Sequence, residues 1–130
     1  MKCLPIVAAL LFITDVCFSQ SQAEMNAAAA KDFQKADKEL NAVYQQVLTD
    51  YKADTAFTRR LRISQRLWLQ LRDAEMDTKF PEPYTYGSIE PMCRSSYKTG
   101  LTVQRIKHLK KWMDGIDEGE VCNGSVKIKQ

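Results

Sequence analysis

The stretch LNAVYQQVLTDY, residues 40–51, decides the fold class. Its apolar side chains recur at positions i, i+3, i+4, i+7, i+8 and i+11: Leu40, Val43, Tyr44, Val47, Leu48 and Tyr51. This spacing predicts an amphipathic helix that buries one face against other helices. No glycine or proline interrupts the chain between Met25 and Pro81, so long helices are expected throughout this segment.

Two further helices are expected after the one that contains this stretch. The first helix is expected to begin at an N-cap on Asn26, and a second to run from a cap at Asp54 to about Thr78. The short link over residues 52–54 implies that these two helices form an antiparallel hairpin. A third helix is expected from residues 90–93 to Met113.

The segment PEPYTYGS, residues 81–88, interrupts the helical pattern with two prolines and a glycine. We therefore expect an all-α fold: a three-helix antiparallel bundle with a proline-rich loop between the second and third helices. The chain shows no internal repeat and no linker, which predicts a single domain over residues 24–130.

The first 23 residues are expected to be a signal peptide, cleaved near Ala23. Lys2 precedes an apolar run from Leu4 to Ile13, which is too short to span a bilayer, and small residues stand before the expected cut. A retained anchor, a cut after Ser19 and a lipoprotein acylated on Cys17 are the alternatives. The signal peptide predicts a periplasmic or secreted protein without a membrane span.

Cysteine usage agrees with export. Cys3 and Cys17 would leave with the signal peptide, so the mature chain would keep Cys93 and Cys122. A pair of cysteines in an exported chain predicts a disulfide, which would tether the C-terminal tail to the start of the third helix. Closing that loop would stabilise the fold by about 3–4 kcal/mol. A metal site is the weaker alternative, because no CxxC spacing is present.

Catalysis, cofactors and metals find little support in the sequence. His108 is the only histidine and lies in the basic run KHLKK, with no nucleophile indicated nearby. The acidic segment DGIDEGE, residues 114–120, lacks the ligand spacing of a calcium loop. We expect no catalytic residue, no metal and no cofactor, and hence no enzyme. The net charge of +3 permits a nucleic-acid partner, but the predicted compartment argues against one.

Two groups of residues are candidates for binding. Arg59, Arg62 and Arg66 recur at i, i+3 and i+7, so their guanidinium groups line one face of the second helix and suit carboxylates or phosphates. A solubilising face paired with acids of the first helix is the alternative. Tyr84 and Tyr86 lie in the proline-rich loop, where aromatic side chains serve an interface or pack onto the bundle.

Four short motifs resemble one protein family. They are AD..LN..Y over residues 36–44, Q..W...RD over residues 65–73, GS..PM over residues 87–92 and LT..R over residues 101–105. In this order they resemble the LprI N-terminal domain family of small secreted proteins, named after a lysozyme-inhibiting lipoprotein. Many relatives carry cysteines where this chain has Met76 and, approximately, Tyr97. The resemblance implies that this branch replaces their usual bridge with one between Cys93 and Cys122.

The shared motif residues are interpreted mainly as scaffold. They are Asp37, Asn41, Tyr44, Trp68, Arg72, Asp73 and Arg105. In an antiparallel hairpin, Arg72 is expected to pair with Asp37 while Trp68 packs between the helices. Direct contact with a partner is the alternative role of this motif.

The resemblance implies a non-enzymatic exported protein that binds a lysozyme-type enzyme and blocks its cleft. The rival interpretation is a cell-envelope adaptor that binds an anionic polymer or another envelope protein through its arginine-rich helix face. A small glycan-acting enzyme that uses an acid such as Asp73 is a third possibility.

Overall fold

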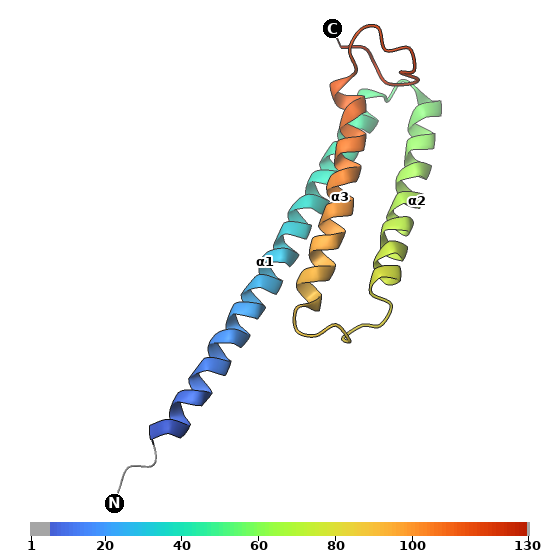
Figure 1. Cartoon of the computed structure of the whole chain (residues 1–130). Coiled ribbons are helices and arrows are strands. Elements are labelled where there is room, and N and C mark those ends of the chain that lie inside the picture. Colours follow the sequence, from blue (N-terminus) through green and yellow to red (C-terminus); the bar gives the residue numbers. More distant parts are fainter. Residues whose placement is uncertain (1–5, 130) are drawn as a thin grey trace, which may run out of the picture.

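Three helices account for almost all of the regular structure in the computed structural model (Figure 1). The structure describes the backbone of residues 6–129 and the side chains of residues 21–129. The helices are α1 (Ile6–Asp50), α2 (Thr55–Lys79) and α3 (Glu90–Asp114). The predicted all-α class is confirmed. The chain reverses direction at each connection, so α2 runs antiparallel to α1 and α3 (Figure 1).

Local signals set the ends of α2 and α3. The Asp54 side chain caps α2 by accepting a hydrogen bond from the Phe57 backbone N–H at 2.9 Å. Pro91 occupies the first turn of α3, where a missing N–H costs nothing. Gly115 ends α3 with φ of 73°, and a Cβ there would lie 2.8 Å from the Lys127 carbonyl oxygen. Glycine is therefore required at this helix end.

The start of α1 differs from the prediction. Asn26 does not cap the helix, because α1 continues without a break from Ile6 and no helix-breaking residue separates the two segments. The Asn26 amide instead donates to the Ser88 carbonyl oxygen at 3.1 Å and thereby joins α1 to the proline-rich loop. Residues 1–5 of the predicted signal peptide lie outside the described residues, as do the side chains of residues 6–20. The predicted cut near Ala23 stays a prediction.

Within the described part of the chain, no helix is both long enough and apolar enough to cross a membrane.

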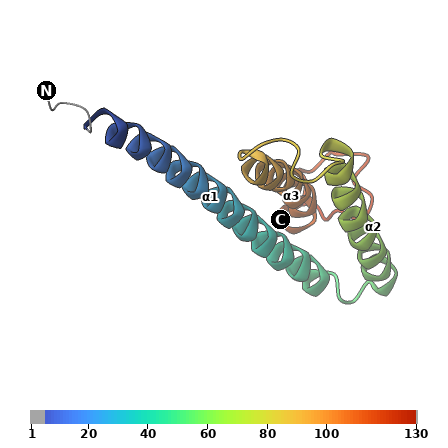
Figure 2. The same ribbon diagram turned by 90° about the horizontal axis from the view of Figure 1, so that it is seen from below.

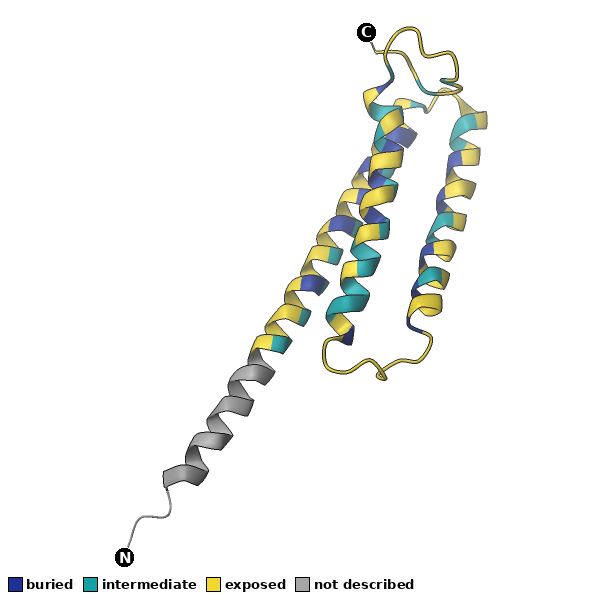
Figure 3. Cartoon of the chain, viewed as in Figure 1, coloured by how far each residue is buried: buried dark blue, intermediate teal, exposed yellow. Residues whose placement is uncertain are grey.

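The apolar core lies mainly between α1 and α3, which are the most closely packed pair of helices. Figure 2 shows α3 alongside α1, with α2 set to one side, and Figure 3 shows the buried residues on the facing sides of the helices. The buried core residues are Leu40, Val43, Val47 and Leu48 of α1, Leu61 of α2, and Ile106 and Leu109 of α3. The apolar stripe of residues 40–51 therefore contributes much of the core, but it faces α3 more than the expected hairpin partner α2.

The predicted disulfide is wrong for this structure. Cys93 and Cys122 are both free. Cys93 lies in the first turn of α3, whereas Cys122 belongs to the tail that follows the last turn. A helix rises about 1.5 Å per residue, so roughly 30 Å of α3 separates Cys93 from the start of the tail. That distance far exceeds the reach of a disulfide.

Hydrogen bonds hold the tail in place of the disulfide. The Tyr51 hydroxyl donates to the Trp112 carbonyl oxygen at 3.1 Å and accepts from the Lys127 N–H at 3.2 Å. The Trp112 indole N–H donates to the Ser125 hydroxyl at 2.9 Å. A short parallel bridge pairs Ile116 with Ile128. The tail is thus fastened to the ends of α1 and α3 that lie far from Cys93 (Figure 1).

Candidate binding surfaces

A polar network formed by the motif residues links all three helices. Arg72 of α2 is buried, with a side chain only 8% exposed, and its guanidinium lies 3.2 Å from the Asp37 carboxylate of α1. The same guanidinium also lies 3.2 Å from Asp73, whose carboxylate is 3.4 Å from the Lys98 ammonium of α3. The ion pair expected between Arg72 and Asp37 is therefore present. A buried charge needs such partners, because burying it alone is costly.

Trp68 occupies the middle of this network, partly buried against the core as expected. The Arg72 guanidinium lies 5.3 Å from the centre of its rings, and the Arg105 guanidinium of α3 lies 5.7 Å from it. Arg105 also donates to the Gln65 amide oxygen and the Ser64 hydroxyl of α2, each at 3.0 Å. Two arginines from different helices thus meet at one indole, an arrangement favoured by cation–π attraction.

The remaining motif residues support α1. Tyr44 is half-buried against the core, and the Asn41 amide donates to the Asp37 carboxylate at 3.5 Å. Asn41 thus bonds to the same carboxylate that receives Arg72. All seven motif residues thus lie where the helices meet or beside that point, which agrees with the scaffold interpretation.

The predicted arginine row lies on the outward side of α2. Arg59, Arg62 and Arg66 are exposed, and among the described residues none forms an ion pair with an acid of α1. The expected pairing of this face with acids of the first helix is therefore absent among the described residues, whereas the exposure of the row agrees with a solubilising face as well as with a binding one. Ile63 and Leu67 lie beside the arginines, with 47% and 58% of their surfaces exposed. Exposed aliphatic residues flanked by unpaired guanidinium groups form a surface suited to binding.

The proline-rich loop projects one aromatic side chain and packs another partly onto the protein. Tyr84 is 96% exposed and has φ of 66°, an uncommon conformation for a residue other than glycine. Tyr86 is 43% exposed and its ring meets the buried Phe80 ring edge-on, with centroids 5.6 Å apart. The two tyrosines that the sequence grouped together therefore differ: Tyr86 packs partly onto the protein, whereas Tyr84 projects from it.

Glu90 fixes the conformation of this loop. Its buried carboxylate accepts hydrogen bonds from the backbone N–H groups of Tyr84 at 3.2 Å and Tyr86 at 3.1 Å, and it lies 2.7 Å from Arg94. The hydrogen bond from Arg94 and the two backbone hydrogen bonds hold the pKa of Glu90 below its usual value, against the opposing effect of burial. Tyr84 is thus presented by an ordered backbone. This role of Glu90 cannot be read from the sequence, because two of its partners are backbone groups.

The acidic tail and the candidate catalytic acids are placed as ordinary surface groups. Asp117 pairs with Lys129 at 2.9 Å, and Asp73 is paired with Arg72 and Lys98. Among the side chains that the structure describes, no three His, Cys, Asp or Glu residues are grouped so that they could hold a metal ion.

These features define a small all-α protein in which a polar network attaches the second helix. The arginine row and Tyr84 of the proline-rich loop are exposed. Comparison with known proteins then gives the family. The model of the lysozyme inhibitor LprI family matches residues 17–109, so the chain belongs to this family. The match covers all four motifs that carried the resemblance.

Among curated proteins, the chain is similar to the uncharacterized protein R02472 of Rhizobium meliloti (strain 1021). The two are 32% identical over 108 residues, which cover 75% of this chain and 77% of the relative. No solved structure matches this chain.

Proposed function

We propose that this protein is an exported, non-enzymatic binding protein that inhibits a lysozyme. The observation that carries the proposal is membership of the lysozyme inhibitor LprI family over residues 17–109. Export is supported by the apolar run near the N-terminus, which has the length and flanking residues of a signal peptide. The non-enzymatic role is supported by the pairing of Asp73 with two cations, which suits a structural carboxylate.

Tyr84 is the residue that we expect to anchor the contact with lysozyme. Tyrosine brings a large contact area at a low entropic cost, and it is enriched among the residues that dominate binding energy. The Glu90 carboxylate fixes the backbone around Tyr84 before any partner arrives, which lowers the cost of association. A projecting aromatic side chain on an ordered loop suits the cleft of a glycan-hydrolysing enzyme. Long-range steering does not assist this contact, because the net charge is +3 and many lysozymes are basic.

The test is a titration of the purified chain, produced with its own N-terminal segment, into a panel of lysozymes. Cell-wall lysis and direct binding are followed together, and N-terminal sequencing of the exported protein should find Glu24 first. Tyr84→Ala should weaken binding by about tenfold or more. Val121→Ala is the matched control, because Val121 is 93% exposed in the tail at the other end of the molecule. Failure of every lysozyme to bind would contradict the proposal.

The arginine row supports a second candidate function, that of an envelope adaptor. The absence of ion pairs for Arg59, Arg62 and Arg66 among the described residues leaves three cations free to meet an anionic polymer. Binding of polyglutamate to the chain should then weaken steeply as salt is raised, because exposed charges are screened. Arg62→Gln should reduce that binding and leave lysozyme inhibition unchanged. Polyglutamate binding that is insensitive to salt would contradict this function.

A further inference from the structure

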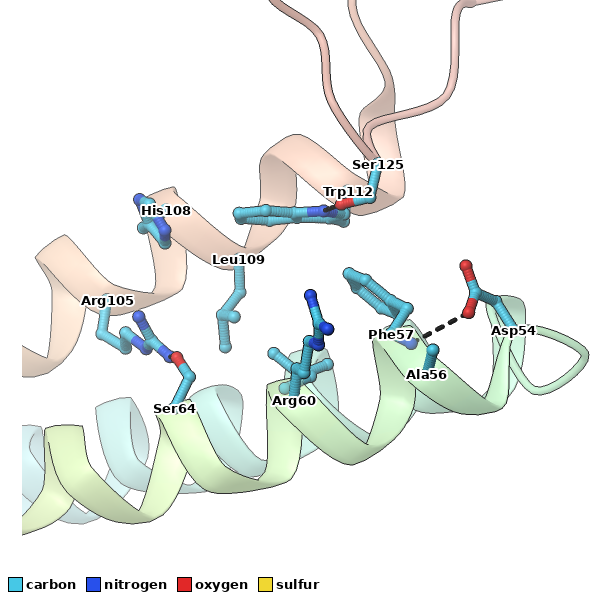
Figure 4. Close-up of a pocket in the computed structure, with 11 residues that line it drawn as sticks. Asp54, Ala56, Phe57, Arg60, Ser64, Arg105, His108, Leu109, Trp112 and Ser125 are labelled. Carbon is cyan, nitrogen blue, oxygen red and sulfur yellow. Dashed lines mark hydrogen bonds between the residues drawn. The ribbon is translucent and has the colours of Figure 1, made fainter.

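A groove lies between α2 and α3 (Figure 4). Its lining includes none of Arg59, Arg62 and Arg66 and no residue of the proline-rich loop. Its cavity has a volume of about 400 Å³ and lies toward the end of the molecule that carries the tail. This volume falls in the range of small-molecule sites, roughly 300–1,000 Å³. The α2–α3 groove is walled by Phe57 and Arg60 from α2 and by Arg105, His108 and Trp112 from α3.

The charges that line the groove are mostly positive. Arg60 and Arg105 carry permanent charges, and His108 lies between Arg105 and Trp112 on the same face of α3. The only acid lining this cavity is Asp54, and its carboxylate already accepts the Phe57 N–H as the cap of α2. Glu75 lines a shallower continuation of the groove on the far side of Arg105. With Arg60 and Arg105 against one carboxylate, the lining of the main cavity carries an excess of positive charge.

Arg105 is the most informative of these groups. It is half-buried, and burial lowers the pKa of its guanidinium. Its hydrogen bonds go to the neutral acceptors Gln65 and Ser64, and it forms no ion pair among the described residues. A guanidinium has five N–H donors, so these two bonds leave several unused. A partly desolvated cation with unused donors favours an incoming anion.

The rest of the wall is apolar. The Phe57 and Trp112 rings are tilted with their centroids 6.3 Å apart, and Leu61 and Leu109 lie beside them. The indole N–H of Trp112 is already bonded to Ser125, so its ring offers the groove an apolar surface. Aromatic walls of this kind bind a flat or aliphatic group by burial and stacking.

We propose that the α2–α3 groove binds a small organic carboxylate, with the carboxylate held by Arg60 and Arg105 and the apolar body packed against Phe57 and Trp112. Planar guanidinium forks match a carboxylate in shape, and two permanent cations with apolar walls suit a single negative charge better than a highly charged ligand. This site is separate from lysozyme inhibition and does not depend on it.

The chain carries its own reporters for this site. His108 is the only histidine in the sequence, so the resonances of its imidazole report the groove without ambiguity. Trp112 lines the main cavity and Trp68 its continuation, so both tryptophans respond in fluorescence. The probe is N-acetylphenylalanine, and its neutral amide is the matched control because the two differ only in the carboxylate.

Titration of the full chain with N-acetylphenylalanine should shift the His108 resonances and change the tryptophan fluorescence in a saturable way. The amide should bind at least about tenfold more weakly, because it lacks the charge-assisted hydrogen bonds. Equal binding of the two probes would overturn the proposal, as would the absence of a saturable response to the carboxylate at millimolar concentrations.

Two neighbouring arginines of α2 provide the mutational test. Arg60→Gln removes a cation that lines the groove, whereas Arg59→Gln removes the same charge from the outward face. Arg60→Gln should weaken carboxylate binding by about 3- to 10-fold, and Arg59→Gln should leave it unchanged. Both side chains are exposed, so neither variant should fail to fold. Equal losses in the two variants would show that only the overall charge matters and would overturn the proposed site.

Discussion

α1 and α3 are held together differently from α2. Among the side chains of α1 that the structure describes, the buried ones are all apolar, and they pack closely against α3, where Ile106 and Leu109 are buried. α2 buries two polar residues, Gln65 and Arg72, and both bond to side chains of other helices. α3 also buries two, Glu90 and Thr102, but these bond within α3 and to the proline-rich loop. Burial of apolar surface is non-directional, whereas buried polar groups need particular partners. The α1–α3 pair is therefore a packed scaffold, and specific polar contacts attach α2 to it.

The difference has a consequence for function. An attachment through one polar side of α2 leaves its outward side exposed, with the arginine row interleaved with aliphatic residues. It also leaves the α2–α3 groove open instead of filling it with side chains. The loop that follows α2 carries Tyr84. The three candidate binding surfaces thus all involve α2 or the segment that follows it.

Leucine substitutions in the two regions should give the largest difference in the free energy of unfolding. Leu109 is fully buried between α1 and α3, whereas Leu67 on the outward side of α2 is 58% exposed. Leu109→Ala should lower the free energy of unfolding by about 3 kcal/mol, because it removes buried methyl groups and leaves a cavity. Leu67→Ala should change it by less than about 0.5 kcal/mol. Chemical denaturation measures both. Similar losses in the two variants would mean that α2 is buried on both sides in solution.

Removal of the Arg72 side chain tests the polar attachment. Arg72→Ala should lower the free energy of unfolding by about 2 kcal/mol, since it breaks the ion pair with Asp37 and removes packing on Trp68. The loss is smaller than for a fully buried pair because the Asp37 side chain is 38% exposed. Arg66→Ala on the same helix is the control and should be nearly neutral. An Arg72→Ala variant with full stability and lost partner binding would show that the motif contacts the partner directly.

Acid should loosen the loop before it unfolds the scaffold. The pKa of Glu90 is lowered in the folded state, chiefly by Arg94, so the unfolded state binds a proton at a higher pH than the folded state does. The stabilisation is therefore complete above the unfolded pKa, about 4.3, and is lost as the pH falls through the folded pKa. Amide exchange of Tyr84 and Tyr86 should accelerate in this range after correction for intrinsic rates. Glu90→Gln should show the fast exchange already at neutral pH; unchanged exchange would contradict the role of Glu90.

The smallest expected effect concerns the cysteines. Replacing Cys93 and Cys122 by serine should change the free energy of unfolding by less than about 0.5 kcal/mol each, because the two thiols are free and far apart. Alkylation of the purified protein without reduction, followed by mass spectrometry, should modify both residues. A mass that shows an intramolecular bond between them would contradict the arrangement of α3 and the tail.

The sequence predicted the helices well where strong local signals mark their ends. The second helix was expected from the Asp54 cap to about Thr78 and runs over Thr55–Lys79, because a cap and two prolines bound it. The antiparallel turn also sufficed to predict that Arg72 meets Asp37. The disulfide prediction failed because an even number of cysteines says nothing about distance, whereas the length of α3 does.

The groove was missed although the sequence held a signal for it. Arg105, His108 and Trp112 recur at i, i+3 and i+7, the same spacing that identified the arginine row. These residues form a groove only because Phe57 and Arg60 face them from α2. Tertiary packing sets that register. The preference of α1 for α3 over α2 was equally hidden, because all three helices carry apolar residues at helical spacing.

Hydrogen exchange of the free protein tests most directly whether α2 is the weakly attached element. Amides within Thr55–Lys79 should exchange through a local opening of lower free energy than amides in residues 40–50 of α1 and 102–112 of α3. Arg72→Ala should accelerate exchange in α2 and leave the other two helices nearly unchanged. Equal protection of all three helices, lost together in the variant, would show one uniform core. That result would contradict the division between the α1–α3 scaffold and α2.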